Sequence, residues 1–209
     1  ADAINTQSSG AGTLNATAGS GGIFLDEADA GIIGTVTTTG AGNIKIQNLA
    51  DGTLSSSGVV SSTSTSNIDL LSLGKLSLGA NVTSAGGNIT LAADTNSNEA
   101  TGVEKFEQTA GTIGSGGGTV GITVATGAGT GTGGAELRAI NSGAGTLTVT
   151  SHRGSIIEQA SGVSLLTSSA DITLKAGETT QGSTSVGTRA DAINTQSSGA
   201  GTPNATAGS

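Results

Sequence analysis

The chain has 209 residues with 37 glycines, two aromatic residues, Phe24 and Phe106, and no cysteine. This composition excludes a core built around bulky rings, and it excludes disulfide bonds and thiolate metal sites. The formal net charge of −8, without a cluster of Lys or Arg, argues against nucleic-acid binding, which needs cations to neutralise phosphates. No apolar run reaches the roughly 18 residues that cross a bilayer, so no membrane span is expected in this fragment.

A long internal repeat is visible first. Residues 1–20 recur at 190–209, and the two copies differ only where Leu14 is replaced by Pro203. The repeat indicates a piece of a longer tandem array. We therefore expect one unit of 189 residues at 1–189 and the start of the next unit at 190–209.

Pairs of apolar residues separated by one position recur along the unit. This period of two predicts half-buried β-strands, and no segment keeps the spacing of an amphipathic helix over three turns. The pairs, in chain order, are Leu14 and Ala16, Ile44 and Ile46, Ile68 and Leu70, Ile89 and Leu91, Val120 and Ile122, Leu147 and Val149, and Ile172 and Leu174. Apart from the first pair, these residues form the predicted core.

A second predicted strand precedes each of the six later pairs and also the start of the next unit's pair at position 203, separated from it by a turn of Gly, Ser, Thr or Asn. Each strand is anchored by one aliphatic residue: Val36, Val60, Val82, Ile113, Ile140, Leu166 and Ile193. Successive pairs are 21 to 31 residues apart, which fits coils that stack on each other while extra residues leave as loops. The sequence therefore predicts an all-β fold, a parallel β-helix (β-solenoid) with about seven coils per 189-residue unit.

Polar residues stand directly before six of the pairs: Asn43, Asn67, Asn88, Thr119, Thr146 and Asp171. If the coils stack about 4.8 Å apart, these side chains form a column at one corner. Amides in such a column can hydrogen-bond to the coils above and below. We expect a structural corner ladder built on Asn43, Asn67, Asn88 and Asp171.

No catalytic or metal-binding constellation stands out. His152 is the only histidine and is expected at a solvent-facing turn, so no catalytic triad is predicted through it. The acids Asp26, Glu27 and Asp29 lack the spacing of known calcium loops, and the glycine-rich stretch 129–134 lacks the strand and helix that a nucleotide fingerprint requires. We predict no enzyme activity, no cofactor and no metal.

Four segments resemble a known family. GNITLAAD, ADITLKAGE, GSIIEQASG and GAGTLTVTS look like coils of filamentous-haemagglutinin-type exoproteins, large bacterial surface adhesins exported by two-partner secretion. The resemblance implies a right-handed parallel β-helix, passage through the outer membrane, and a fibre-like shaft outside the cell. It covers almost the whole chain through degenerate motifs.

The expected function is a structural shaft or filament segment of a secreted adhesin at the bacterial cell surface, which gives a stiff rod for cell attachment or cell-cell contact. Its expected partners are neighbouring repeat units through end-to-end self-association, because a solenoid exposes strand edges at both ends. The alternative is a module that binds carbohydrate, a host surface or another partner through loops at 95–112 and 125–138, where long loops carry function.

Overall fold

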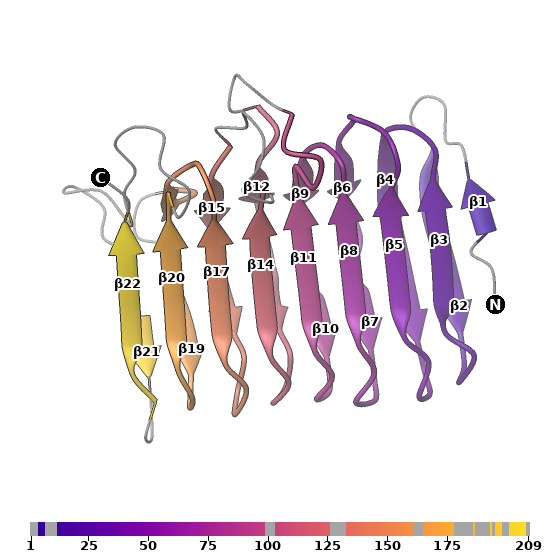
Figure 1. The fold of residues 1–209 in the computed structure, drawn as a ribbon. Helices are drawn as coiled ribbons and strands as arrows, with labels where there is room; N and C mark the ends of the chain where they lie inside the picture. The colour runs from indigo at the N-terminus through magenta and orange to yellow at the C-terminus, as the bar shows by residue number, and fades with distance from the viewer. Residues whose placement is uncertain are drawn as a thin grey trace.

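The structure is a computed structural model that describes residues 4–6, 12–98, 103–125, 133–160, 165–177, 186, 193, 195–197 and 201–207. All regular secondary structure in these residues is β, and all strand pairs are parallel, so the predicted parallel β-helix is confirmed. In Figure 1 the front strands run upward, the strands behind them run downward, and successive turns advance from right to left, which is a right-handed path.

The front sheet contains the longest run of regular strands. From β3 to β20 its strands have five residues each, and they pair in register without a bulge. Within the described residues the order is β1 (Ile4–Thr6), β3 (Ile23–Glu27), β5 (Ile44–Asn48), β8 (Ile68–Ser72), β11 (Ile89–Ala93), β14 (Val120–Val124), β17 (Leu147–Ser151), β20 (Ile172–Ala176) and β22 (Pro203–Ala207).

The second sheet forms the back of the solenoid and has two stacks that meet at the long strand β4 (Gly31–Thr38). The first back stack continues from the start of β4 through β6 (Leu54–Ser56), β9 (Leu76–Leu78), β12 (Phe106–Gln108), β15 (Ala135–Leu137) and β18 (Ile156–Glu158). The second back stack continues from its end through β7 (Val60–Ser62), β10 (Val82–Ser84), β13 (Thr112–Gly114), β16 (Ala139–Asn141), β19 (Leu165–Ser168) and β21 (Thr195–Ser197), and β2 (Thr13–Ala18) pairs with β4 on the other side.

Each regular turn therefore has three strands, one at the front and two at the back (Figure 1). The sequence predicted only two, and the first back stack was missed. Strands of three residues, in which two buried positions flank one outward residue, are too short to show a clear period of two. The anchors Val36, Val60, Val82, Ile113, Ile140 and Leu166 do occupy one aligned column of the second back stack.

The first predicted front pair is wrong. Leu14 and Ala16 lie in β2 of the back sheet, where Ala16 is level with Val36. The first front strand with a pair of buried aliphatic residues is β3, with Ile23 and Leu25. The sequence prediction treated the 30 residues from Leu14 to Ile44 as one coil. The coil that reaches Ile44 starts instead at Ile23 and is 21 residues long. Two larger side chains that point into the core favour β3 at the front. Six turns separate Ile23 from Ile172, and a seventh reaches Pro203.

The two copies of the repeated segment occupy different places. In the first copy Ile4–Thr6 pairs with the front strand β3 and Thr13–Ala18 lies at the back. In the second copy Thr195–Ser197 lies at the back and Pro203–Ala207 lies at the front. The anchor predicted at Ile193 is therefore wrong, since Thr195 is the residue level with Leu166.

A narrow aliphatic core runs along the axis between the front and back sheets. The twelve core residues named from the sequence are at most 3% exposed. They are Ile44, Ile46, Ile68, Leu70, Ile89, Leu91, Val120, Ile122, Leu147, Val149, Ile172 and Leu174. Burial of each such side chain contributes roughly 1.5 to 3 kcal/mol, and the first back stack adds fully buried Leu54, Leu76, Phe106 and Leu137.

Candidate functional site

The residues before the front strands form a polar column at one corner. The side-chain oxygen of Asn43 accepts the backbone N–H of Asn67 at 2.9 Å, that of Asn67 accepts Asn88 N–H at 3.0 Å, and that of Asn88 accepts Thr119 N–H at 2.9 Å. Higher in the stack the Asp171 carboxylate accepts the N–H of Thr202 at 2.9 Å. These bonds run from a side chain to the backbone of the following coil, so they tie each coil to the next one.

A second polar column was not found from the sequence. It lies inside the corner that follows the second back stack, two residues after each anchor, and its members are at most 5% exposed: Thr38, Ser62, Ser84, Ser115, Ser142 and Ser168. Ser84 shows its role, since its hydroxyl donates to the Ser66 carbonyl at 2.8 Å and accepts the N–H of Gly87 at 2.8 Å. These serines satisfy turn backbone that would otherwise be buried without partners. The pattern of an aliphatic residue, any residue and Ser is visible in the sequence and could have found them.

Glycines directly before the polar ladder positions allow the backbones of successive coils to approach closely. A Cβ on Gly118 would lie within 3.0 Å of the Gly87 carbonyl in the previous coil, and a Cβ on Gly145 would meet the Gly118 carbonyl in the same way. Three successive coils therefore need glycine because their backbones approach closely, although none of these three residues has a positive φ.

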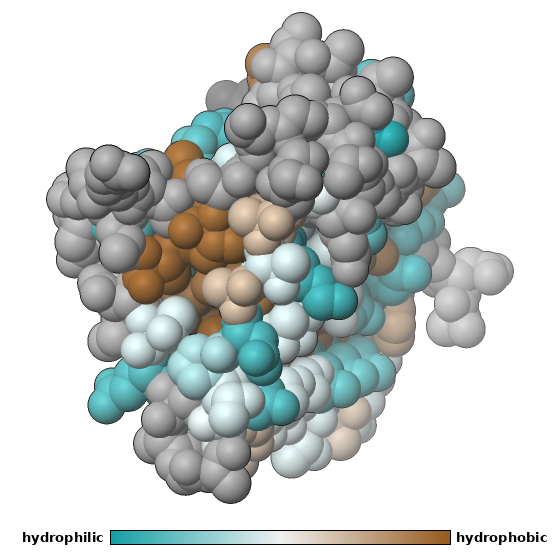
Figure 2. All heavy atoms as spheres, turned by 60° about the vertical axis from the view of Figure 1, so that its left-hand side comes forward, coloured by the Kyte–Doolittle hydropathy of each residue, from teal (hydrophilic) through white to brown (hydrophobic). Residues whose placement is uncertain are grey.

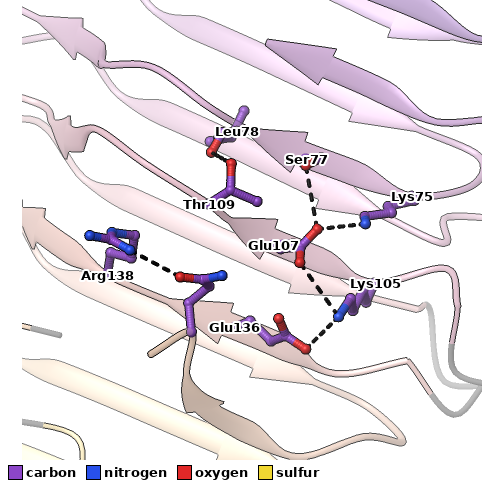
Figure 3. A network of polar contacts seen from close by, with 9 residues as sticks. Lys75, Ser77, Leu78, Lys105, Glu107, Thr109, Glu136 and Arg138 are labelled. Carbon is purple, nitrogen blue, oxygen red and sulfur yellow. Dashed lines mark hydrogen bonds and ion pairs between the residues drawn. The ribbon is translucent and has the colours of Figure 1, made fainter. Parts of the chain in front are cut away.

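A charged cluster lies on the outer surface of the first back stack (Figure 3). Glu107 and Glu136 are neighbours in the register of β12 and β15, so two carboxylates stand one above the other. Lys105 bridges them, with its Nζ 2.5 Å from Glu136 Oε1 and 3.7 Å from Glu107 Oε1. Lys75 Nζ lies 2.5 Å from Glu107 Oε2. The lysines therefore compensate a repulsion between like charges that the register would otherwise impose.

These contacts set the ionisation of one acid. Partial burial raises the pKa of the Glu107 carboxyl, but the hydrogen bond and charge of Lys75, the charge of Lys105 and the Ser77 hydroxyl outweigh this effect. The pKa therefore lies below its usual range, and Glu107 stays charged at neutral pH. Side chains in the cluster are 16% to 25% exposed, so the cluster is a semi-buried ion-pair network that contributes to the surface of the rod.

The predicted binding loops are shorter than expected. The range 95–112 contains the core strand β12, in which Phe106 is fully buried, and the range 125–138 contains β15. Positions 99–102 and 126–132, which include most of the glycine-rich stretch, lie outside the described residues. In the described part of the first loop, Asn96 and Asn98 donate to the Asp51 carboxylate, the second bond being 2.8 Å.

The candidate acids and the histidine do not converge. Asp26 points outward beside Gln47, whereas Glu27 is fully buried and accepts the Thr6 hydroxyl at 2.9 Å. His152 lies half-buried at the corner after β17, where its backbone N–H donates to Val124. Across the part of the chain that the structure describes, no three acidic or histidine side chains are grouped for a metal ion. In the same residues no helix has the length and apolar character to cross a membrane.

The last described strand, β22, contributes little to the core. All five residues of β22 are exposed, and a cavity of about 250 Å³ lies beside them, lined by Ile172, Leu174, Val186, Ile193, Thr195, Pro203, Asn204 and Ala205. Figure 2 shows apolar surface exposed at this end. Small residues on β22 leave the interior of the last turn incompletely filled.

The fold and these polar columns define a parallel β-solenoid whose described side chains serve mainly to join coil to coil. Comparison with family models, with curated proteins and with solved structures yielded no match for this chain.

Proposed function

We propose that the chain is a shaft segment of a secreted bacterial surface adhesin, in which it provides a stiff rod for cell attachment or cell-cell contact. The observation that carries the proposal is the front sheet, where seven strands from Ile23 to Ala176 pair in unbroken register over a filled core. The resemblance of several coils to filamentous-haemagglutinin-type exoproteins supports the extracellular location.

The physical basis of stiffness is the repetition of the same contacts in every turn. Bending the rod would have to stretch front-sheet hydrogen bonds, corner bonds such as Asn43 to Asn67, and the packing of the aliphatic column at once. A spacing of about 4.8 Å per turn gives roughly 34 Å for the seven turns from Ile23 to Pro203.

The test is length as a function of repeat number. Chains with one, two and four tandem copies of residues 1–189 would be imaged by negative-stain electron microscopy. A shaft predicts straight particles that lengthen by about 30 to 40 Å with each copy. Particles that fold back into compact clusters, or whose length does not grow with copy number, would rule out the rod.

A second candidate function is carbohydrate or partner binding beside the shortened loops. The observation that favours it is the grouping of Asp51, Asn96 and Asn98 near the first back stack, because carboxylates and amides are suited to hydrogen-bond sugar hydroxyls. Binding of the chain to a glycan array that is lost in Asp51→Ala, but kept in a distant surface variant such as Lys175→Ala, would support this function. The absence of any bound glycan would leave the shaft as the better proposal.

A further inference from the structure

Four Asn-x-Thr motifs occur in the chain, and they begin at Asn15, Asn81, Asn88 and Asn204. In secreted proteins this motif is the acceptor of N-linked sugars, which are attached to the side-chain nitrogen Nδ2 of the asparagine. The accessibility of that nitrogen therefore decides which of the motifs can be modified in the folded chain. The structure divides the four asparagines into two pairs.

Asn81 and Asn88 belong to one coil and have the same arrangement. Each is exposed and stands directly before a strand, Asn81 before β10 and Asn88 before β11. The Oδ1 of Asn81 accepts the backbone N–H of Thr112 at 2.9 Å, just as the Oδ1 of Asn88 accepts that of Thr119. Neither Nδ2 makes a hydrogen bond among the described residues. The oxygen of each amide thus holds the next coil, while the nitrogen is left to solvent.

The threonine of each of these two motifs faces the same side as its asparagine. The middle residue, Val82 or Ile89, is at most 1% exposed, so the residues before and after it point outward. The hydroxyls of Thr83 and Thr90 make no hydrogen bond among the described residues. A transferase can therefore reach the amide and the hydroxyl of one motif from the same side of the rod.

Asn15 and Asn204 are arranged differently. Both lie within strands, Asn15 in β2 and Asn204 in β22. The Nδ2 of Asn15 donates to the Thr13 hydroxyl at 3.2 Å, and the Nδ2 of Asn204 donates to the Thr202 hydroxyl at 3.4 Å. In this pair the nitrogen that would carry a sugar already has a partner in the chain.

We propose that Asn81 and Asn88 are acceptor sites for N-linked sugar in the folded chain, and that Asn15 and Asn204 are not. The sugar is supplied as a diphosphate ester by a transferase. The asparagine Nδ2 forms a bond to the anomeric carbon, the bond from that carbon to the diphosphate oxygen breaks, and the diphosphate leaves with the bonding electrons. Nδ2 gives up one proton to a base of the transferase. The biological role of the sugars rests on the proposed location outside the cell, whereas the choice of sites is argued from the structure.

An attached sugar is compatible with the fold. Substitution at Nδ2 replaces one amide hydrogen and leaves Oδ1 free to accept, so the bonds to Thr112 and Thr119 are kept. Asn81 precedes a strand of the back sheet and Asn88 precedes a strand of the front sheet (Figure 1). Sugars on both would cover different sides of the same coil.

The experiment uses the full, folded 209-residue chain produced in a host without N-glycosylation. One arm combines it with a soluble transferase for Asn-x-Thr acceptors and a nucleoside-diphosphate sugar. The other arm uses a membrane-bound transferase and a lipid-diphosphate oligosaccharide. Peptide mass spectrometry measures the occupancy of each asparagine, and the added mass distinguishes the two donors. Synthetic peptides that span each motif are the unfolded control.

In at least one arm we expect Asn81 and Asn88 of the folded chain to be modified at least tenfold faster than Asn15 and Asn204. The four peptides should differ by less. Thr83→Val should abolish modification at Asn81 only, and Thr83→Ser should retain it, with circular dichroism to check that both variants keep their β structure.

Three outcomes would overturn the assignment. They are absence of sugar at Asn81 or Asn88 in both arms, equal modification of all four sites, and a site preference that is the same in the unfolded peptides. Rods that lengthen with repeat number but accept no sugar would overturn the acceptor sites while leaving the shaft function intact.

Discussion

One sequence occupies two different positions in this molecule. Residues 1–20 and 190–209 differ at a single site, yet the first copy places its INT segment at the front and TLNATA at the back, while the second copy places TQS at the back and PNATA at the front. In the middle of the stack the front column instead repeats without exception from Ile23 to Ile172. A strand's position in this solenoid is therefore decided by the coils it stacks on as much as by its own residues.

The difference between the middle and the ends has an energetic cause. A middle coil is held from both sides by core packing, front-sheet bonds and both polar columns. Among the described residues an end coil has a neighbouring coil on one side only, and the exposed Ala205 and the half-buried Leu14 contribute little to the core. Because few core contacts fix the register of the end coils, the same segment can occupy the front sheet in one copy and the back sheet in the other.

Loss of a large side chain should show the greatest contrast between middle and end. Phe106→Ala removes a fully buried ring in register with Leu76 and Ala135, and we expect it to lower the free energy of unfolding by about 3 to 5 kcal/mol. Leu14→Ala should cost about 1 kcal/mol or less, because that side chain is only half-buried. Urea unfolding followed by circular dichroism measures both. Equal losses would show that the ends are as tightly packed as the middle.

The close approach of backbones at one corner gives the next largest effect. Gly118→Ala would push a Cβ against the Gly87 carbonyl, and we expect a loss of about 2 to 3 kcal/mol. Gly121→Ala is the control three residues away, since a Cβ there meets nothing within 4 Å. Thermal unfolding of the two variants distinguishes them. If both alanines were tolerated equally, close stacking at this corner would be wrong.

The polar ladder should contribute less than the core. Asn67→Ala removes the acceptor of the Asn88 N–H, and we expect a loss of about 1 kcal/mol. Asn67→Asp keeps an acceptor oxygen and should retain most of the stability. Amide hydrogen exchange gives the local test, because the Asn88 N–H should exchange faster in the alanine variant only. Unchanged protection of that N–H would mean that the bond is not formed in solution.

The front strands and their core residues were predictable from the sequence because the pattern that indicates each strand lies within one short segment. Strands of five residues with two large aliphatic side chains, such as Ile44 and Ile46, can be predicted from their alternation of apolar and polar residues. Three-residue strands do not, and β12 was assigned to a loop although it contains Phe106. The stacking of Glu107 on Glu136 could not be predicted from the sequence for a different reason. The coils differ in length, so sequence spacing does not show which residues of successive coils become neighbours. Only the register between coils places those two carboxylates together.

The charged cluster should give a small effect that depends on pH. The pKa of Glu107 is lower in the folded chain than in the unfolded chain, so the charged form stabilises the fold. This contribution is fully present above the unfolded pKa, near 4.5, and is lost as pH falls through the lower folded pKa. Glu107→Gln should therefore cost about 0.5 kcal/mol at pH 7, and the difference from wild type should shrink in urea unfolding below about pH 4. A difference that grows in acid would have the opposite sign and contradict the assignment.

The smallest effect is expected where the two copies differ. On β22 a leucine at position 203 would lie over Ile172 and fill part of the adjacent cavity, whereas Pro203 already suits the first residue of an edge strand. We therefore expect Pro203→Leu to change stability by less than about 0.5 kcal/mol and to leave the register as it is. Cysteine pairs report the register, since parallel neighbours about 4.8 Å apart can form a disulfide.

In the register of the second copy, Leu174 is level with Ala205; in the register of the first copy it would be level with Ile193, the counterpart of Ile4. Leu174→Cys should therefore cross-link with Ala205→Cys, and more slowly with Ile193→Cys, whether position 203 is proline or leucine. If Pro203→Leu instead transfers the cross-link to position 193, one side chain, and not the coil beneath it, selects the place of the segment. Such a transfer would reverse the conclusion drawn from the two copies.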